Sequence, residues 1–189
     1  MIAYLKKTDN ELINLFSDGH EQALDSLIHR YKDKLYNAIL FIVKDKYHAE
    51  DISQEVFIKI IETLKSGRYK EEGKFLPWAM RIAHNLCVDY FRKLKKFPFA
   101  KSSVENDVLE TINSAEANVE EKLIKSQNLG KAQDMLEQLP EEQREVIILR
   151  HFANLSFKEI AEITGCSINT ALGRMRYGLI NLRKMMTGK

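Results

Sequence analysis

Residues 156–170, SFKEIAEITGCSINT, contain the clearest helix start and stop signals in the chain. Ser156 and Glu159 have the spacing of a capping box, in which a hydroxyl and a carboxylate each satisfy a free backbone N–H at a helix start. Gly165 ends a short apolar run and can adopt the positive φ of a helix C-cap. Ser167 is a good N-cap for the next helix. A short helix, a glycine-containing turn and a longer helix are typical of a helix-turn-helix.

The second helix of this motif is expected to run to about Met185 and to suit a DNA groove. Residues 165–189 hold five basic side chains and no acid. Recognition helices place their N-terminal residues at base edges, and Asn or Arg can bond them bidentately. The leading face would carry Asn169, Thr170, Gly173, Arg174 and Tyr177. Farther along, three side chains are expected at phosphates: Arg176, Arg183 and Lys184. The expected buried face is Ile168, Ala171, Met175, Leu179 and Leu182.

Gly173 is unusual in the middle of a helix, where glycine costs about 1 kcal/mol relative to alanine. One interpretation is a close approach of the backbone to DNA. The other is a tight contact with the preceding helix. The sequence leaves both interpretations open.

Apolar residues recur at helical spacing along most of the 189-residue chain, and 8 Gly and 3 Pro are few breakers for that length. We therefore predict an all-α fold. The pattern fades over Phe97–Asn118, which is rich in Ser, Asn and acidic residues. The sequence predicts a helical domain over 1–96, a flexible linker over 97–118 and the helix-turn-helix domain over 119–189.

Composition excludes several classes of protein. The formal net charge is +2, which does not fit a polycation or an acidic tail protein. Two cysteines, Cys87 and Cys166, cannot form a disulfide framework. The start has no signal-like apolar run, and no stretch reaches the roughly 18–20 apolar residues of a membrane span. We expect a cytoplasmic protein without direct membrane insertion, and no cofactor.

A second basic segment, Lys65–Lys96, contains nine bases and three acids, interleaved with aromatic residues. Basic side chains that follow a phosphate backbone, together with aromatic pockets for unstacked bases, are the usual means of binding single strands. Trp78 could belong to such a pocket or simply pack in the core. Two basic surfaces in two helical domains indicate that the protein binds a polyanion, such as a nucleic acid, at two places.

Three motifs, taken in order, resemble bacterial RNA polymerase sigma factors of the extracytoplasmic-function (ECF) subfamily. AEDISQEVFI at 49–58 resembles the family's polymerase-binding helix, and FLPWAMRIAHN at 75–85 resembles its promoter-melting helix. LPEEQREV at 139–146, followed by LSFKEIAEI at 155–163, resembles its final DNA-binding domain. The resemblance implies a factor that directs promoter recognition, DNA melting and transcription initiation.

The resemblance also implies roles for individual residues. The clamp coiled coil of the largest polymerase subunit would meet Glu50, Asp51, Gln54, Glu55 and Phe57. The melted minus-ten strand would meet Arg68, Tyr69, Lys70, Lys74, Trp78, Arg81, Asn85, Arg92 and Lys93. The minus-thirty-five duplex would meet Ser167, Asn169, Thr170, Gly173, Arg174, Arg176, Tyr177 and Lys184. An anti-sigma factor would be the usual antagonist.

The recognition helix departs from the family's pattern. Many members place a basic residue, then Ser, then Arg after the threonine, whereas here Thr170 is followed by Ala171, Leu172, Gly173 and Arg174. Leu172 cannot bond a base edge or a phosphate. The promoter sequence therefore cannot be inferred from better-known members.

Two other classes of protein share parts of this pattern. A free-standing helix-turn-helix regulator would bind duplex DNA as a dimer and would not need the acidic helix around Asp51. An enzyme is conceivable because His84 and Cys87 lie three apart on one helix. No second Cys/His pair has metal-ligand spacing, so we expect no metal site and no catalysis.

Overall fold

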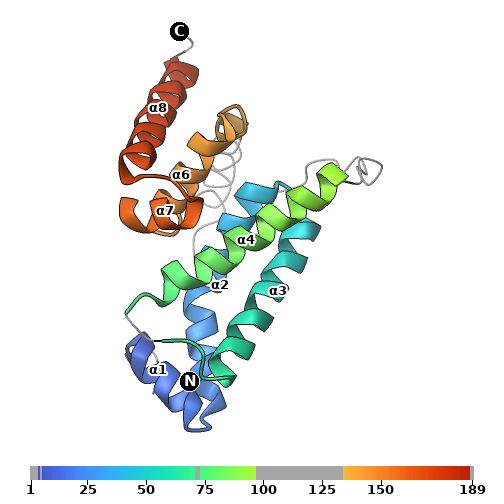
Figure 1. Ribbon diagram of the computed structural model, residues 1–189, viewed down its shortest axis with the longest axis vertical. Helices are drawn as coiled ribbons and strands as arrows, with labels where there is room; N and C mark the ends of the chain where they lie inside the picture. The colour runs from blue at the N-terminus through green and yellow to red at the C-terminus, as the bar shows by residue number, and fades with distance from the viewer. Residues whose placement is uncertain (1–3, 5, 71–72, 97–133, 188–189) are drawn as a thin grey trace, which may run out of the picture. The chain divides into compact units, whose positions relative to one another are not determined.

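The computed structural model describes residues 4, 6–70, 73–96 and 134–187, apart from the side chains of Lys95 and Lys96. The expected linker at 97–118 lies outside these residues. Every regular element in the described part of the chain is a helix, which confirms the all-α prediction (Figure 1). The described residues form two compact units, the first holding α1 to α4 and the second α6 to α8.

The first unit consists of four helices: α1 (Asp9–Ser17), α2 (Glu21–Val43), α3 (Lys46–Lys65) and α4 (Phe75–Lys96). α2 packs against both α1 and α4, and α3 meets α4 where the rings of His48 and Tyr90 lie 4.8 Å apart. The core of this unit includes Leu12, Leu27, Leu35, Ile39, Val56, Ile60 and Met80, all nearly inaccessible to solvent. Each such side chain contributes about 1.5–3 kcal/mol through burial.

A capping box that the sequence analysis did not single out starts α1. The backbone N–H and the hydroxyl of Thr8 donate to the Glu11 carboxylate over 2.7 and 3.0 Å. The Glu11 N–H donates back to the Thr8 hydroxyl. The signal was present in the sequence as Thr8-Asp-Asn-Glu11, the same spacing as Ser156 and Glu159.

α1 is fastened to α2 through Asp9. Arg30 and the Tyr31 hydroxyl each donate to one oxygen of the Asp9 carboxylate over 2.5 Å. Arg30 also donates to the Lys7 carbonyl over 2.7 Å. Burial, and then the hydrogen bond to Asp9, raises the pKa of Tyr31 above its ordinary value. The hydroxyl therefore stays protonated as a donor.

The second unit contains α6 (Glu141–His151), α7 (Phe157–Thr164) and α8 (Ile168–Thr187), each packed against the other two. Its capping box is confirmed, because the Ser156 N–H donates to the Glu159 carboxylate and the Glu159 N–H donates to the Ser156 hydroxyl. Gly165 closes α7 in the left-handed region at φ 65°. The Ser167 hydroxyl accepts the Thr170 N–H and starts α8. The predicted helix-turn-helix is confirmed.

The predicted buried face of α8 is partly wrong. Ala171 is buried, but Ile168 and Leu179 are 46% and 50% exposed. Instead α8 approaches α6 through Gly178, where an added Cβ would lie 2.7 Å from Ile147 Cδ1. One helical turn on, the Asn181 amide donates to the Gln143 side chain over 2.9 Å. The contact with α6 therefore includes Gly178 and Asn181, which a search for large apolar side chains does not find, while Met175 and Leu182 of the predicted face are half-buried.

None of the helices among the described residues combines the length and the apolar character that a bilayer span requires.

Candidate nucleic-acid interface

The N-terminal half of α8 presents most of the predicted duplex-reading residues to solvent. Asn169, Thr170, Arg176 and Tyr177 are exposed, and Gly173 and Arg174 are half-buried. Ser167 is exposed, but its hydroxyl is already engaged as the N-cap with both the N–H and the hydroxyl of Thr170. Lys184 is exposed two turns farther along.

Gly173 has open space around its Cα. No heavy atom would lie within 4 Å of a Cβ built there, apart from the helix's own backbone and the chain neighbours. The interpretation of Gly173 as a tight helix–helix contact is therefore wrong. The close contact between helices falls at Gly178, one and a half turns later.

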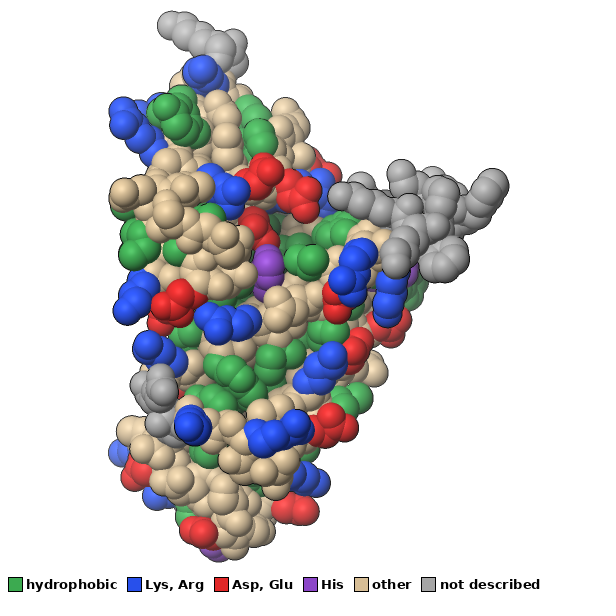
Figure 2. Space-filling view, in the orientation of Figure 1, with side chains coloured by type: hydrophobic (Ala, Val, Ile, Leu, Met, Phe, Trp, Pro, Cys, Tyr) green, Lys and Arg blue, Asp and Glu red, His purple; other side chains and the backbone are tan. Residues whose placement is uncertain are grey.

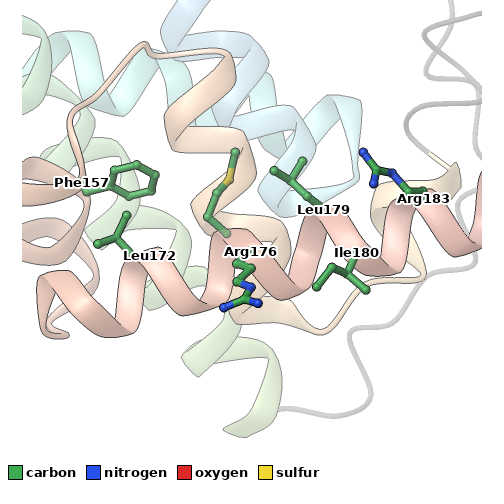
Figure 3. Close-up of a pocket in the computed structure, with 7 residues that line it drawn as sticks. Phe157, Leu172, Arg176, Leu179, Ile180 and Arg183 are labelled. Atoms are coloured by element: carbon green, nitrogen blue, oxygen red, sulfur yellow. The ribbon is translucent and has the colours of Figure 1, made fainter.

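An apolar groove runs along α8 beside the start of α7 (Figure 3). It is lined by Phe157, Leu172, Met175, Arg176, Leu179, Ile180 and Arg183. Hydrophobic side chains and Lys or Arg side chains also lie next to one another along the edge of α8 in Figure 2. The groove was not expected from the sequence, because helical spacing predicted that Met175 and Leu179 would be buried.

The basic segment of the first unit begins in the loop between α3 and α4. Arg68, Lys70 and Lys74 are exposed there, and Tyr69 is half-buried. Tyr69 lies with its ring centroid 4.4 Å from Trp78 and 6.0 Å from Phe75. Phe75 is buried and also contacts Tyr31 of α2 at 5.4 Å.

Trp78 therefore belongs to an aromatic cluster, which we define as Tyr31, Tyr69, Phe75 and Trp78. It is half-buried and lies 5.6 Å from Phe75 between ring centroids. The two interpretations of Trp78 are compatible, because the residue packs in this cluster and is only half-buried. Aromatic pairs of this kind contribute about 0.5–1.5 kcal/mol beyond burial.

α4 continues the basic surface along its exposed side. Arg81, Asn85 and Arg92 are exposed, and their spacings of four and seven residues place them on one side of the helix. On the other side, Ala79, Ala83 and Leu86 are buried. Lys93 is exposed next to Arg92. Arg92 forms a surface ion pair with Asp89 over 2.9 Å, and such pairs are worth little in water. Exchanging Asp89 for a phosphate would therefore cost Arg92 little.

The predicted polymerase-binding residues lie on α3. Glu50, Asp51, Gln54 and Glu55 are exposed and Phe57 is half-buried. The opposite side of α3, including Ala49, Ile52, Val56 and Ile60, is buried. Glu55 pairs with Lys59 one turn later over 3.2 Å.

Two large apolar side chains extend the acidic side of α3, and the sequence analysis did not name them. Tyr47 is 69% exposed one turn before Asp51, and Ile58 is 54% exposed one turn after Gln54. We call Tyr47, Asp51, Gln54, Glu55 and Ile58 the α3 face. Exposed apolar residues beside charges are typical of a protein interface.

The His84–Cys87 pair gains no metal-binding partners in the described part of the chain. Cys87 is buried in the helix packing, as expected for a structural cysteine. Among the described residues, no group of three or more His, Cys, Asp or Glu side chains could hold a metal ion.

Two protein families match the chain in the order of these surfaces. Sigma-70 region 2 matches residues 27–97, and sigma-70 region 4 matches residues 129–172. The ECF RNA polymerase sigma factor SigW of Bacillus subtilis is 31% identical over 172 residues, which cover 89% of this chain and 91% of that relative. The ECF RNA polymerase sigma-E factor of Escherichia coli K12 is 28% identical, with 89% of this chain and 88% of the relative covered.

Solved structures show the same fold at lower identity. CnrH, solved in complex with the cytosolic domain of CnrY, superimposes with a TM-score of 0.68 at 19% identity, over 97% of this chain and 99% of that chain. The sigma factor RpoE from Bartonella quintana, solved with the anti-sigma factor NepR, gives a TM-score of 0.69 at 18% identity, over 87% and 96% of the two chains.

Proposed function

The chain belongs to the extracytoplasmic-function family of RNA polymerase sigma factors, and we propose how its surfaces divide the work of initiation. As a sigma factor it binds core RNA polymerase and directs promoter recognition, rather than catalysing a reaction itself. The observation that supports this division is that the exposed surfaces of α3 and α4 lie within the region 2 match, while α7 and the first turn of α8 lie within the region 4 match. Family membership decides against the free-standing regulator.

The α3 face is the proposed contact with the clamp coiled coil of the largest polymerase subunit. Its acids would meet basic side chains of the clamp, and Tyr47 and Ile58 would lose their exposed apolar area on binding. Charges at the rim steer association, while apolar anchors supply most of the binding free energy. Both components are present on this one side of α3.

The loop after α3 and the exposed side of α4 form the proposed minus-ten site. Arg81, Asn85, Arg92 and Lys93 would follow the separated strand, and the aromatic cluster would receive an unstacked base through the accessible part of Tyr69 and Trp78. Stacking of a base on an aromatic ring is worth about 1–3 kcal/mol, which offsets the few kcal/mol needed to extract it from the duplex.

The N-terminal half of α8 is the proposed reader of the minus-thirty-five duplex. Asn169 and Arg174 can form bidentate bonds with base edges. Arg176, Arg183 and Lys184 would neutralise phosphates and fix the register. Open space at Gly173 supports a close approach of DNA to the helix backbone.

An anti-sigma factor is the proposed antagonist. Two proteins of the same fold were solved as complexes, RpoE with the anti-sigma factor NepR and CnrH with the cytosolic domain of CnrY. A partner that covers the α3 face or the groove along α8 would block polymerase or promoter binding by occupying the same side chains.

Reconstitution with core polymerase tests the function. Run-off transcription from genomic fragments should yield defined transcripts only when this protein is added, and no transcript from any fragment would contradict the proposal. The variant Asp51→Lys/Glu55→Lys should lose most co-purification with core polymerase, because both charges on the α3 face are reversed. Asp25→Lys/Asp33→Lys, which reverses two charges on the exposed side of α2, is the matched control and should bind as wild type.

A further inference from the structure

Leu172 is an apolar side chain in a place where the recognition helix should be polar. It lies five residues after the N-cap Ser167 and remains 43% exposed. Its neighbours on the exposed side of α8 include the polar Thr170 and Arg176 and the apolar Ile168, which is 46% exposed one turn earlier. Helix-turn-helix proteins insert this N-terminal part of the second helix into the major groove. A leucine at this position cannot form a hydrogen bond with DNA, so any favourable contact that it makes there is with an apolar group.

Phe157 adds to the same apolar spot from the neighbouring helix. It is the first residue of α7, and in Figure 3 its ring and the Leu172 side chain lie next to each other at one end of the groove. The Arg150 guanidinium lies 5.3 Å from the centre of the Phe157 ring. Arg176 follows Leu172 by one helical turn. The spot is therefore apolar at its centre, with a cation on either side.

This combination fits the major groove of DNA better than an apolar protein partner. Residues 165–189 include no acid, and the cations beside the spot would neutralise phosphates. In the major groove, the only apolar group that a base pair presents is the C5-methyl of thymine. Leu172 and Phe157 lie at the end of the apolar groove nearest the start of α8, and this end has a complementary surface in a duplex that carries thymine at one or two positions.

We propose that Leu172, with Phe157 beside it, reads thymine methyl groups in the upstream promoter element. The inference rests on the proposed function of α8 as the reader of that duplex, and it specifies what the helix recognises there. It also accounts for the departure from the family's pattern, since Leu172 replaces a polar contact with an apolar one rather than leaving the position without a role.

The experiment removes only the methyl groups. Reconstituted holoenzyme first selects its upstream element from a duplex library randomised in that region. Each thymine of the selected element is then replaced by deoxyuridine, which lacks the methyl and keeps both hydrogen-bonding edges. At one or two positions the affinity of wild-type holoenzyme should fall about threefold to fourfold per methyl lost.

Variants assign the effect to Leu172. Leu172→Ala should bind the thymine duplex more weakly and should no longer distinguish it from the deoxyuridine duplex. Leu172→Met, which keeps an apolar side chain of similar volume, should retain the distinction. Ile180→Ala, two turns farther along the same groove, is the matched control and should also retain it.

The possible negative results distinguish between the methyl contact and the proposed function. A selected element without thymine, an unchanged affinity at every deoxyuridine, or an equal loss in wild type and Leu172→Ala would each overturn the methyl contact while transcription persists. Absence of any transcription from the reconstituted holoenzyme would instead contradict the proposed function itself.

Discussion

At the scale of single residues, Gly178 and Gly173 form a natural comparison on one helix. We expect Gly178→Ala to destabilise the second unit by about 1–3 kcal/mol, because the new Cβ would lie 2.7 Å from Ile147 Cδ1 and 3.4 Å from Gln143 Cβ. Gly173→Ala meets no atom within 4 Å and should stabilise α8 by up to about 1 kcal/mol. Urea unfolding followed by far-UV circular dichroism measures both changes.

The single tryptophan provides the control for this pair. Trp78 lies in the first unit, so its fluorescence transition should not move in either glycine variant. Equal stability of Gly178→Ala and wild type would contradict the close packing of α8 on α6. If Gly173 allows DNA to approach the backbone, Gly173→Ala holoenzyme should bind the promoter more weakly despite its greater stability.

Glu11 makes the stability of the first unit depend on pH in the acidic range. Hydrogen bonds from the Thr8 backbone N–H and then from its hydroxyl hold the pKa of Glu11 below its ordinary value of 4.5. A carboxyl whose pKa is lowered by folding stabilises the protein at pH values above its unfolded pKa. That contribution disappears as the pH falls through the folded pKa.

We therefore expect the Glu11→Gln variant to lose less stability than wild type when the pH is lowered from about 6 to about 3. Thermal unfolding at a series of pH values provides the measurement. Glu21→Gln, which removes an exposed carboxyl outside this capping box, is the comparison variant. An identical pH profile for wild type and Glu11→Gln would show that the Thr8–Glu11 capping box does not contribute.

At the scale of elements, α4 combines a buried stripe with the exposed basic side that we propose holds the melted strand. Asn85→Ala should impair strand separation more than initial duplex binding, because the exposed amide lies between Arg81 and Arg92 on the side proposed to hold the melted strand. Permanganate reactivity of promoter thymines measures melting, and gel shift of the holoenzyme at low temperature measures duplex binding.

The substitution does not weaken the helix, since alanine has a higher helix propensity than asparagine. Asn14→Ala on the exposed side of α1 is the matched control and should melt the promoter as wild type does. If Asn85→Ala reduced duplex binding and melting equally, the side chain would be a general phosphate contact rather than part of the strand-separating surface.

At the scale of the whole molecule, we expect promoter affinity to require that polymerase presents the two proposed DNA-binding surfaces together. We expect the isolated protein to bind promoter duplex weakly, because each unit alone neutralises few phosphates. Log affinity of the holoenzyme should fall by about 0.9 per phosphate contact for each tenfold rise in salt. Fluorescence anisotropy over a salt series provides both quantities.

Lys184→Ala should reduce that salt slope by about 0.9 if Lys184 contacts one phosphate. Lys32→Ala, on the exposed side of α2, should leave the slope unchanged. Nanomolar, sequence-specific binding by the protein without polymerase would contradict the need for joint presentation.

Local interactions were readable in the sequence by itself. The all-α fold, the capping box at Ser156 and Glu159, the left-handed turn at Gly165 and the start of α8 at Ser167 each depend on residues within four positions of one another. In α4, helical periodicity likewise places Ala79, Ala83 and Leu86 on the buried side and Arg81 and Asn85 on the exposed side. Such features need no knowledge of distant segments.

The tertiary structure alone decided which side of α8 faces the core. The packing surface of α6, with Ile147 and Gln143, accepts Gly178 and Asn181 and leaves Leu179 and Leu172 in solvent. The same holds for the aromatic cluster, in which Tyr31 of α2 meets Phe75 of α4. The buried side of a helix depends on the shape and polarity that its neighbours offer, and a helix's own sequence does not contain that information.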